Sequence, residues 1–100
     1  MQSKYSLEIS GKAKIEIDYF ASHYKDISQD LLEKFLEDLQ IISRNLTTNP
    51  EIYTIRYKKF RRVNFSKFPI MLVFMIFEKE NKVKIFACFN QKSNSIKFYI

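Results

Sequence analysis

A dense run of cations lies in the middle of the chain. Six basic side chains occur within twelve residues and no acid interrupts them: Arg56, Lys58, Lys59, Arg61, Arg62 and Lys67. Guanidinium and ammonium groups at this density attract phosphates or an acidic protein. We therefore predict that these six residues, together with Lys92 further along the chain, bind the cellular target.

The charge of the whole chain has the same asymmetry. Its 100 residues carry 17 Lys and Arg against 11 Asp and Glu, a net charge of +6. Residues 1–50 hold six basic and eight acidic side chains, a balance of −2, whereas residues 51–100 hold eleven and three, a balance of +8. An anionic partner is therefore expected on the second half.

Other reactive side chains are few. The single cysteine, Cys88, lies in an apolar run and is expected to be a buried, inert thiol, because no second cysteine is present for a disulfide. The single histidine, His23, is expected at the surface of a helix, and nothing has the spacing of metal ligands. We predict no metal and no cofactor.

The remaining composition indicates one cytoplasmic domain over residues 1–100. This length is typical of a single domain. The N-terminus lacks the apolar region of a secretory signal, and the longest apolar run, 68–77, is about half of the roughly 20 residues that a spanning helix needs. We expect no membrane association.

Periodicity in the first half predicts one strand followed by two long helices. Alternating apolar residues favour a strand over 4–10, and the next apolar stripe favours a helix over 11–24 with Ser10 as N-cap. Asp26 is expected to cap a second helix, with Gln29 reaching back to it, and Asn49-Pro50 to end that helix. Its core stripe is predicted to be Ile27, Leu31, Phe35, Leu39, Ile42 and Leu46. Its acidic side chains Glu33, Glu37 and Asp38 are expected to be solvated.

The second half reads as strands. Two short strands near 55–58 and 62–65 are expected to turn apolar residues inward and bases outward. The runs 70–77 and 83–89, joined by a polar loop of hairpin length, are expected to pair antiparallel at the middle of the sheet, with the first covered on both faces. The predicted fold class is α+β: one N-terminal strand, two long helices on one face of a mainly antiparallel sheet of about five strands, and a short C-terminal apolar segment, 96–100.

Several local motifs resemble the RelE/ParE toxin superfamily, and the resemblance covers nearly the whole chain. Ala13 in the first helix is followed by Ile17 and Tyr24, and 46–50 is similar to a Leu-x-x-Asn-Pro element. The segments 61–65 and 68–74 are similar to the family's Arg and Phe-Pro blocks, and 83–89 to its last long strand. The resemblance implies a growth-inhibiting toxin, of the kind also called a plasmid stabilisation protein. It also implies a complex with a cognate antitoxin, an acidic and partly disordered protein encoded next to it.

The departures from the family favour a ParE-like protein, a class associated with poisoning of DNA gyrase. RelE-like ribosome-dependent mRNA endoribonucleases imply catalytic roles for Arg62 and Tyr99, which match, but the other cations of that set are replaced by Asn64, Met71 and Ser93. The histidine block common in ParE-like toxins is also missing. Residues 90–95 are Asn-Gln-Lys-Ser-Asn-Ser at the corresponding place. A RelE-like RNase is the first alternative, and an inactive family member that acts only as a binding protein is the second.

Overall fold

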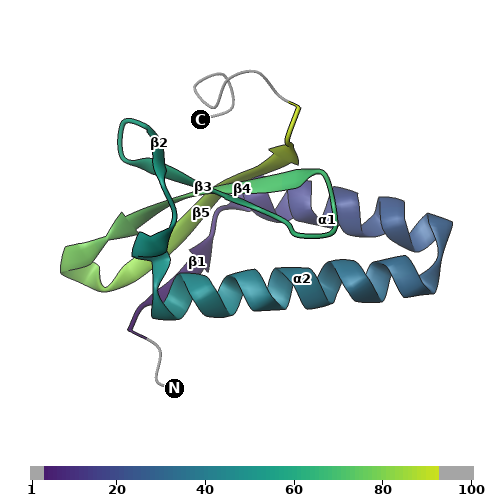
Figure 1. Ribbon diagram of the computed structural model, residues 1–100, viewed down its shortest axis with the longest axis horizontal. Coiled ribbons are helices and arrows are strands. Elements are labelled where there is room, and N and C mark those ends of the chain that lie inside the picture. Colours follow the sequence, from purple (N-terminus) through teal and green to yellow (C-terminus); the bar gives the residue numbers. More distant parts are fainter. Residues whose placement is uncertain (1–3, 93–100) are drawn as a thin grey trace.

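Two antiparallel helices lie on one face of a twisted sheet (Figure 1). The computed structural model describes residues 4–92. In this part the helices are α1 (Gly11–Ile27) and α2 (Gln29–Thr48), and the strands are β1 (Ser6–Ile9), β2 (Ile55–Tyr57), β3 (Phe60–Asn64), β4 (Ile70–Phe77) and β5 (Lys82–Asn90). Short 3-10 turns, η1 (Pro50–Ile52) and η2 (Glu78–Glu80), precede β2 and β5. The predicted α+β class is confirmed.

The strands lie in the order β1-β5-β4-β3-β2. Each strand from β2 to β5 pairs antiparallel with the next one along the chain. The two apolar runs that were predicted to pair at the middle of the sheet are β4 and β5. β1 pairs with β5 in parallel, from Ser6 opposite Lys82 to Ile9 opposite Ile85. The two long helices carry the chain from β1 at one edge of the sheet to β2 at the other, and the strands β2 to β5 then return to lie beside β1.

Serine hydroxyls begin both helices. The Ser10 side chain accepts a hydrogen bond from the Ala13 amide at 3.1 Å, as predicted. The predicted Asp26 cap is wrong, because α1 continues through Asp26 to Ile27 and the extended residue Ser28 caps α2 by accepting from the Leu31 amide at 3.1 Å. Ile27 thus belongs to the last turn of α1, and it is 59% exposed rather than part of the core stripe.

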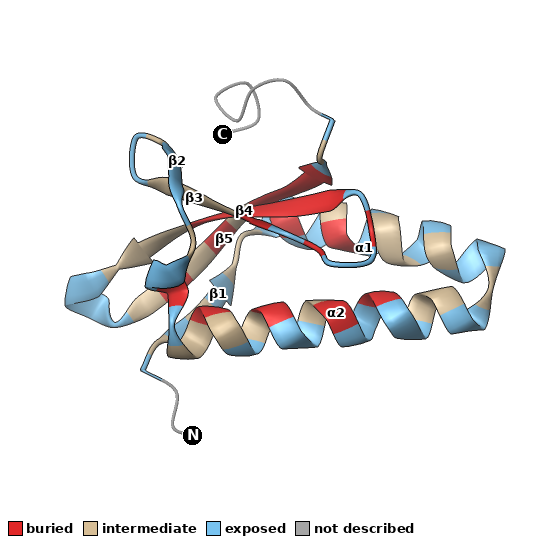
Figure 2. Ribbon diagram, viewed as in Figure 1, coloured by how far each residue is buried: buried red, intermediate tan, exposed pale blue. Residues whose placement is uncertain are grey.

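The main core lies between the helices and the sheet (Figure 2). Phe35 of α2 is fully buried and stacks on Phe65, with ring centroids 5.3 Å apart. Tyr24 of α1 packs against Phe68 at 4.5 Å. The helices therefore cover one face of the sheet, as expected, and aromatic side chains of both helices pack against residues 65–68, between β3 and β4.

The opposite face of the sheet carries a smaller buried cluster. It consists of Met71, Val73, Ala87 and Phe89, with Phe60 packed against it. In β4 the residues 70–74 are buried whereas 75–77 are only half-buried. The expected covering of both faces therefore applies to the first part of β4 and not to its end.

Asp38 is buried, which corrects the expectation that it belongs to the solvated face of α2. Its side chain is 4% exposed. Its carboxylate accepts from the Ser66 amide at 3.0 Å, the Ser66 hydroxyl at 3.1 Å and the Lys67 amide at 3.1 Å. A helix side chain thereby fixes the loop that joins β3 to β4.

Polar side chains of α1 cover the part of the β5 edge that β1 leaves free. β1 ends opposite Ile85, and beyond this point the Cys88 amide donates to Oε1 of Glu16 at 2.9 Å. Glu16 is held in turn by Lys12, with Nζ and Oε2 2.9 Å apart.

Across residues 4–92 no helix is long and apolar enough to span a membrane. The predicted C-terminal segment 96–100 lies outside the described residues.

Candidate target-binding surface

The β2–β3 hairpin carries most of the predicted cationic residues. Arg56 on β2 is exposed, and Lys58 and Lys59 form the exposed turn. Lys58 has a φ of 51°, in the left-handed region that glycine or asparagine adopts more easily, and its ammonium lies 5.3 Å from the centre of the Tyr57 ring. The tip of the hairpin therefore presents two adjacent lysines.

Arg61 has a structural role that the sequence did not predict. It shares the helix-side parity of Val63 and is half-buried. Its Nη1 donates to the Tyr53 carbonyl at 2.7 Å and to the Glu51 carbonyl at 3.4 Å. Arg61 thus anchors the segment that precedes β2, and the expectation that all bases of these strands turn outward is wrong here. The expectation also fails for Ile55, which is 49% exposed instead of packed inward.

Arg62 lies on the open face of the sheet, which is the face opposite the helices, because it alternates with the same period as Phe60 along β3. Its Nε donates to Oδ1 of Asn64 at 2.9 Å, and Asn64 stands opposite Met71 in the β3–β4 register. The positions compared with RelE-like catalytic cations therefore adjoin one another in space. Among the described ones, Arg62 supplies a cation and Asn64 and Met71 do not.

Lys67 and Lys92 lie at the other end of β3 and β4, away from the hairpin tip. Lys67 follows β3, and its ammonium is 3.5 Å from Glu37 of α2. Lys92 follows β5 and is exposed, next to Gln91, whose side chain donates to the carbonyls of Phe68 and Ile70. The predicted set thus divides into a hairpin group and a distal pair, with Arg62 between them. Tyr99 and Ser93 lie outside the described residues.

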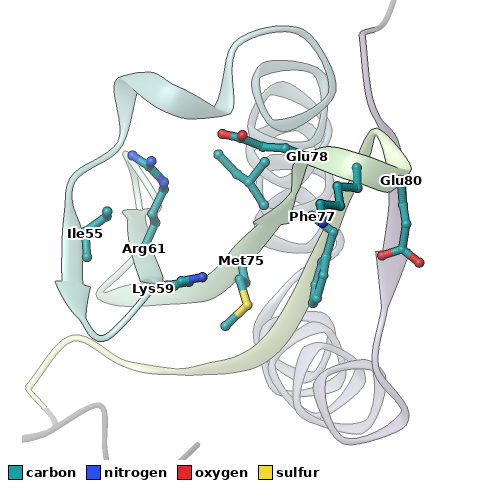
Figure 3. A pocket seen from close by; sticks show the side chains of 9 residues that line it. Ile55, Lys59, Arg61, Met75, Phe77, Glu78 and Glu80 are labelled. Carbon is teal, nitrogen blue, oxygen red and sulfur yellow. The ribbon is translucent and has the colours of Figure 1, made fainter.

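An open groove of about 720 Å³ separates the hairpin from the end of β4. Figure 3 shows Ile55, Lys59 and Arg61 along one side, and Met75, Phe77 and Glu78 along the other. Ile76, Lys79 and Glu80 complete the lining. Cationic and apolar side chains therefore line the same groove.

A second cationic feature on the open face was missed by the sequence reasoning. Lys82 and Lys84 of β5 lie over the rings of Phe77 and Phe86, at 5.3 and 5.2 Å from the ring centres. Both bind Glu8 of β1 at 3.2 Å, and these hydrogen bonds hold the pKa of Glu8 below its ordinary value. The alternation of lysine and apolar residues from 82 to 85 was the available signal.

The remaining candidates have the predicted surroundings. Cys88 is 1% exposed, and burial, assisted by the charge of Glu16, raises the pKa of its thiol to about 12. His23 is exposed on α1, with its ring against that of Tyr24. No group of three or more potential metal ligands occurs in the described residues.

The fold can be compared with that of solved proteins. A chain of the chromosomal ParDE TA system from P. aeruginosa superposes with a TM-score of 0.70 at 18% identity, covering 87% of this chain and 96% of that one. The chain has the RelE/ParE toxin fold. A substituted E. coli RelE toxin in the free state gives 0.64 at 11% identity, with 98% and 94% covered, and the isolated E. coli RelE toxin gives 0.54 at 10%, with 94% and 90% covered. No family model and no curated protein sequence matches the chain.

Within the RelE/ParE fold of this chain, the sheet face opposite the helices carries Arg62, Lys82 and Lys84. The β2–β3 hairpin extends beside it at the sheet edge (Figure 1). The arrangement can bind anions over an apolar surface.

Proposed function

We propose that this chain is the toxin of a type II toxin–antitoxin pair, ParE-like, which inhibits bacterial growth by poisoning DNA gyrase in the cytoplasm. The observation that carries the proposal is the fold shared with a chain of a ParDE system over 87% of the present sequence. The cationic hairpin and Arg62 are the surface that we assign to target contact.

The antitoxin of the proposal is an acidic protein bound to the second half of the chain. The +8 balance of residues 51–100 provides the electrostatic attraction, because charges of one sign on a surface accelerate the association of an oppositely charged partner. Binding to the folded state alone raises its apparent stability, so thermal unfolding is expected at higher temperature as antitoxin concentration rises.

A growth assay tests the proposal. Expression of the chain without a partner is expected to slow growth, and Lys59→Ala with Arg62→Ala is expected to relieve the effect in a folded protein. Arg61 is kept unchanged, since it anchors the carbonyls of Glu51 and Tyr53. The matched control, Lys14→Ala on the exposed part of α1, removes one cation away from the hairpin and is expected to stay toxic.

Purified protein then identifies the target. Inhibition of supercoiling by gyrase, lost in the double variant, supports the ParE-like function. Unchanged toxicity of the folded double variant would contradict the assignment of this surface.

A RelE-like ribosome-dependent mRNA endoribonuclease is the alternative, because the RelE toxin gives a TM-score of 0.64 over 98% of this chain. Transition states of phosphoryl chemistry need several positioned charges, and Asn64 and Met71 supply none where cations were expected. We therefore expect no cleavage of mRNA in the ribosomal A site. Cleavage that Tyr99→Phe abolishes would favour the RNase, and absence of any growth effect would favour an inactive binding protein.

A further inference from the structure

β5 extends further along the sheet than its parallel partner β1. The register of the two strands ends with Ile9 opposite Ile85, whereas β5 continues to Asn90. On its other side β5 stays paired with β4 to its end. A strand edge that extends beyond its neighbour is open to pairing with a strand of another molecule unless something covers it. At Phe86 and Cys88 the cover comes from the start of α1.

A bulge in β5 turns the Cys88 amide away from β4. In the β4–β5 register the partner changes from Ile85 to Ala87 over one step of β4, so Phe86 is an extra residue. The Ile85 carbonyl faces outward, where it accepts from the amide at the end of β1 at 2.9 Å. In a regular strand the backbone of a residue three positions later would face β4 instead. Because of the bulge, the Cys88 amide faces outward as well.

Glu16 occupies this outward amide. Its Oε1 accepts from the Cys88 amide at 2.9 Å, and its Oε2 binds the Lys12 ammonium at 2.9 Å. Beside it, the Ser10 hydroxyl donates to the Phe86 carbonyl at 3.3 Å. The Glu16 side chain is 25% exposed, so water reaches only part of it. A carboxylate accepts hydrogen bonds but has no backbone to continue a ladder, so strand pairing stops at this point.

The edge that Glu16 covers belongs to an uncharged and largely apolar stretch. Residues 85–91 contain no Asp, Glu, Lys or Arg, and no Gly or Pro. Segments of this kind pair readily with identical segments of other molecules, whereas a charged partner gains no ion pair from them. On the same turns of α1 as Glu16, the side chains of Ile15 and Tyr19 are 72% and 68% exposed. A second copy of this chain is therefore the partner that fits this edge.

We propose that Glu16 keeps the β5 edge at Cys88 closed to a second copy of the chain. When the carboxylate is lost, two chains pair antiparallel at this edge, and their sheets become continuous. Both copies contribute the same residues, so the contact has two-fold symmetry and closes as a dimer. The inference does not depend on the proposed function, because it concerns the edge of β5 and not the cationic hairpin.

Sedimentation of the full chain tests the proposal. The parent is expected to keep the mass of a single chain as its concentration rises, whereas Glu16→Ala is expected to shift toward the mass of two chains. The matched control is Asp18→Ala, which removes an exposed acid from α1 and leaves the Glu16 carboxylate in place, and it should behave like the parent. A folded Glu16→Ala chain that stays single at every concentration overturns the proposal, and so does a parent that dimerises to the same extent.

Amide hydrogen exchange locates the contact. In dilute Glu16→Ala the Cys88 amide is expected to exchange at least about tenfold faster than in the parent, because its charged acceptor is lost. At high concentration the same amide is expected to be protected again by the second copy. Glu16→Gln keeps a neutral acceptor and serves if the alanine variant fails to fold, with exchange about fivefold faster than in the parent and protection that rises with concentration. Unchanged exchange in both variants contradicts the proposal.

Other causes of association give distinct results. Asp38→Ala removes the acceptor that holds the β3–β4 loop and leaves Glu16 in place. A dimer formed equally by this variant would mean that lost stability alone drives association, and the proposal would be wrong. Association of Glu16→Ala that leaves the Cys88 amide in rapid exchange, and that Ile15→Ser with Tyr19→Ser abolishes, would assign the contact to the outer face of α1 and also refute it.

Discussion

Replacement of Asp38 by alanine is expected to be the most destabilising single change at a polar residue of α2. The carboxylate accepts three hydrogen bonds, two of them from the amides of Ser66 and Lys67. Hydrogen bonds to a charged group contribute about 1.5–3 kcal/mol each to stability. The three share one acceptor and water can reach the exposed donors, so the loss is smaller than their sum. We expect about 3 kcal/mol.

Chemical and thermal unfolding measure this loss. About 3 kcal/mol corresponds to a fall in Tm of roughly 12–24 °C for a domain of this size. Asp38→Asn keeps one carbonyl acceptor and is expected to cost less than alanine. Glu37→Ala is the matched control, because the adjacent side chain is exposed and makes only a 3.5 Å ion pair with Lys67.

The control is expected to stay within about 0.5 kcal/mol of the parent. A double-mutant cycle of Asp38→Ala with Ser66→Ala is expected to show coupling of about 1 kcal/mol, since the two share the 3.1 Å hydroxyl contact. A loss below about 1 kcal/mol for Asp38→Ala, with an unchanged denaturant slope, would refute the conclusion that this carboxylate holds the β3–β4 loop.

Four further predictions concern three other side chains. The Cys88 thiol, with its pKa raised to about 12, is expected to resist alkylation in the native state and to react only on unfolding; rapid modification of folded protein would contradict its burial. The thiol ionises near pH 9 in the unfolded chain, whereas it stays protonated in the folded chain up to about pH 12. The free energy of unfolding should therefore fall between pH 9 and 12 by up to about 1.4 kcal/mol per pH unit. Cys88→Ala should remove this component of alkaline unfolding. The pKa of Glu8 is lowered by Lys82 and Lys84, so the stabilising effect of Glu8 should be present above about pH 4.5 and disappear as the pH falls through the lowered value. The difference in free energy of unfolding between Glu8→Gln and the parent should therefore become smaller in acid. A difference that does not become smaller would argue against the ion pairs. Ser28→Ala should cost about 1 kcal/mol in urea unfolding, and a cost no larger than that of Asp26→Ala would restore Asp26 as the cap.

Local patterns predicted the elements because each depends on neighbours in sequence. The Ser10 cap requires only an amide three residues ahead, and the two apolar runs 70–77 and 83–89 are joined by a loop too short for any pairing except antiparallel. The helical periodicity was also sufficient to indicate that Asp38 is buried, because Asp38 lies three residues after Phe35 and four before Ile42 on the buried side of α2. Its charge led to a solvated assignment, because the loop that supplies its partners is 28 residues away.

The candidate site was predictable in composition but not in geometry. The density of cations identified the hairpin, yet the pairing of Arg61 depends on a register shift between Ile55 and Tyr57 and on the turn at Lys58, which has a positive φ. Nothing local shows that the pairing of β3 with β4 ends at Arg61 opposite Phe74, three residues before the end of β4. The groove arises from that mismatch of strand lengths, which only the assembled sheet reveals.

The parallel pairing of β1 with β5 has a consequence for the order of events during synthesis. Ser10, at the end of β1, hydrogen-bonds to Phe86, 76 positions later. Until the ribosome has released β5, α1 and α2 have no completed sheet to cover, and the nascent chain exposes its apolar faces. A chain interrupted before residue 82 therefore lacks both the parallel pair and the neighbour of β4, so incomplete translation products should be unfolded and unable to present the cationic hairpin on a rigid sheet. The activity of the protein would then begin only when its last described strand is in place.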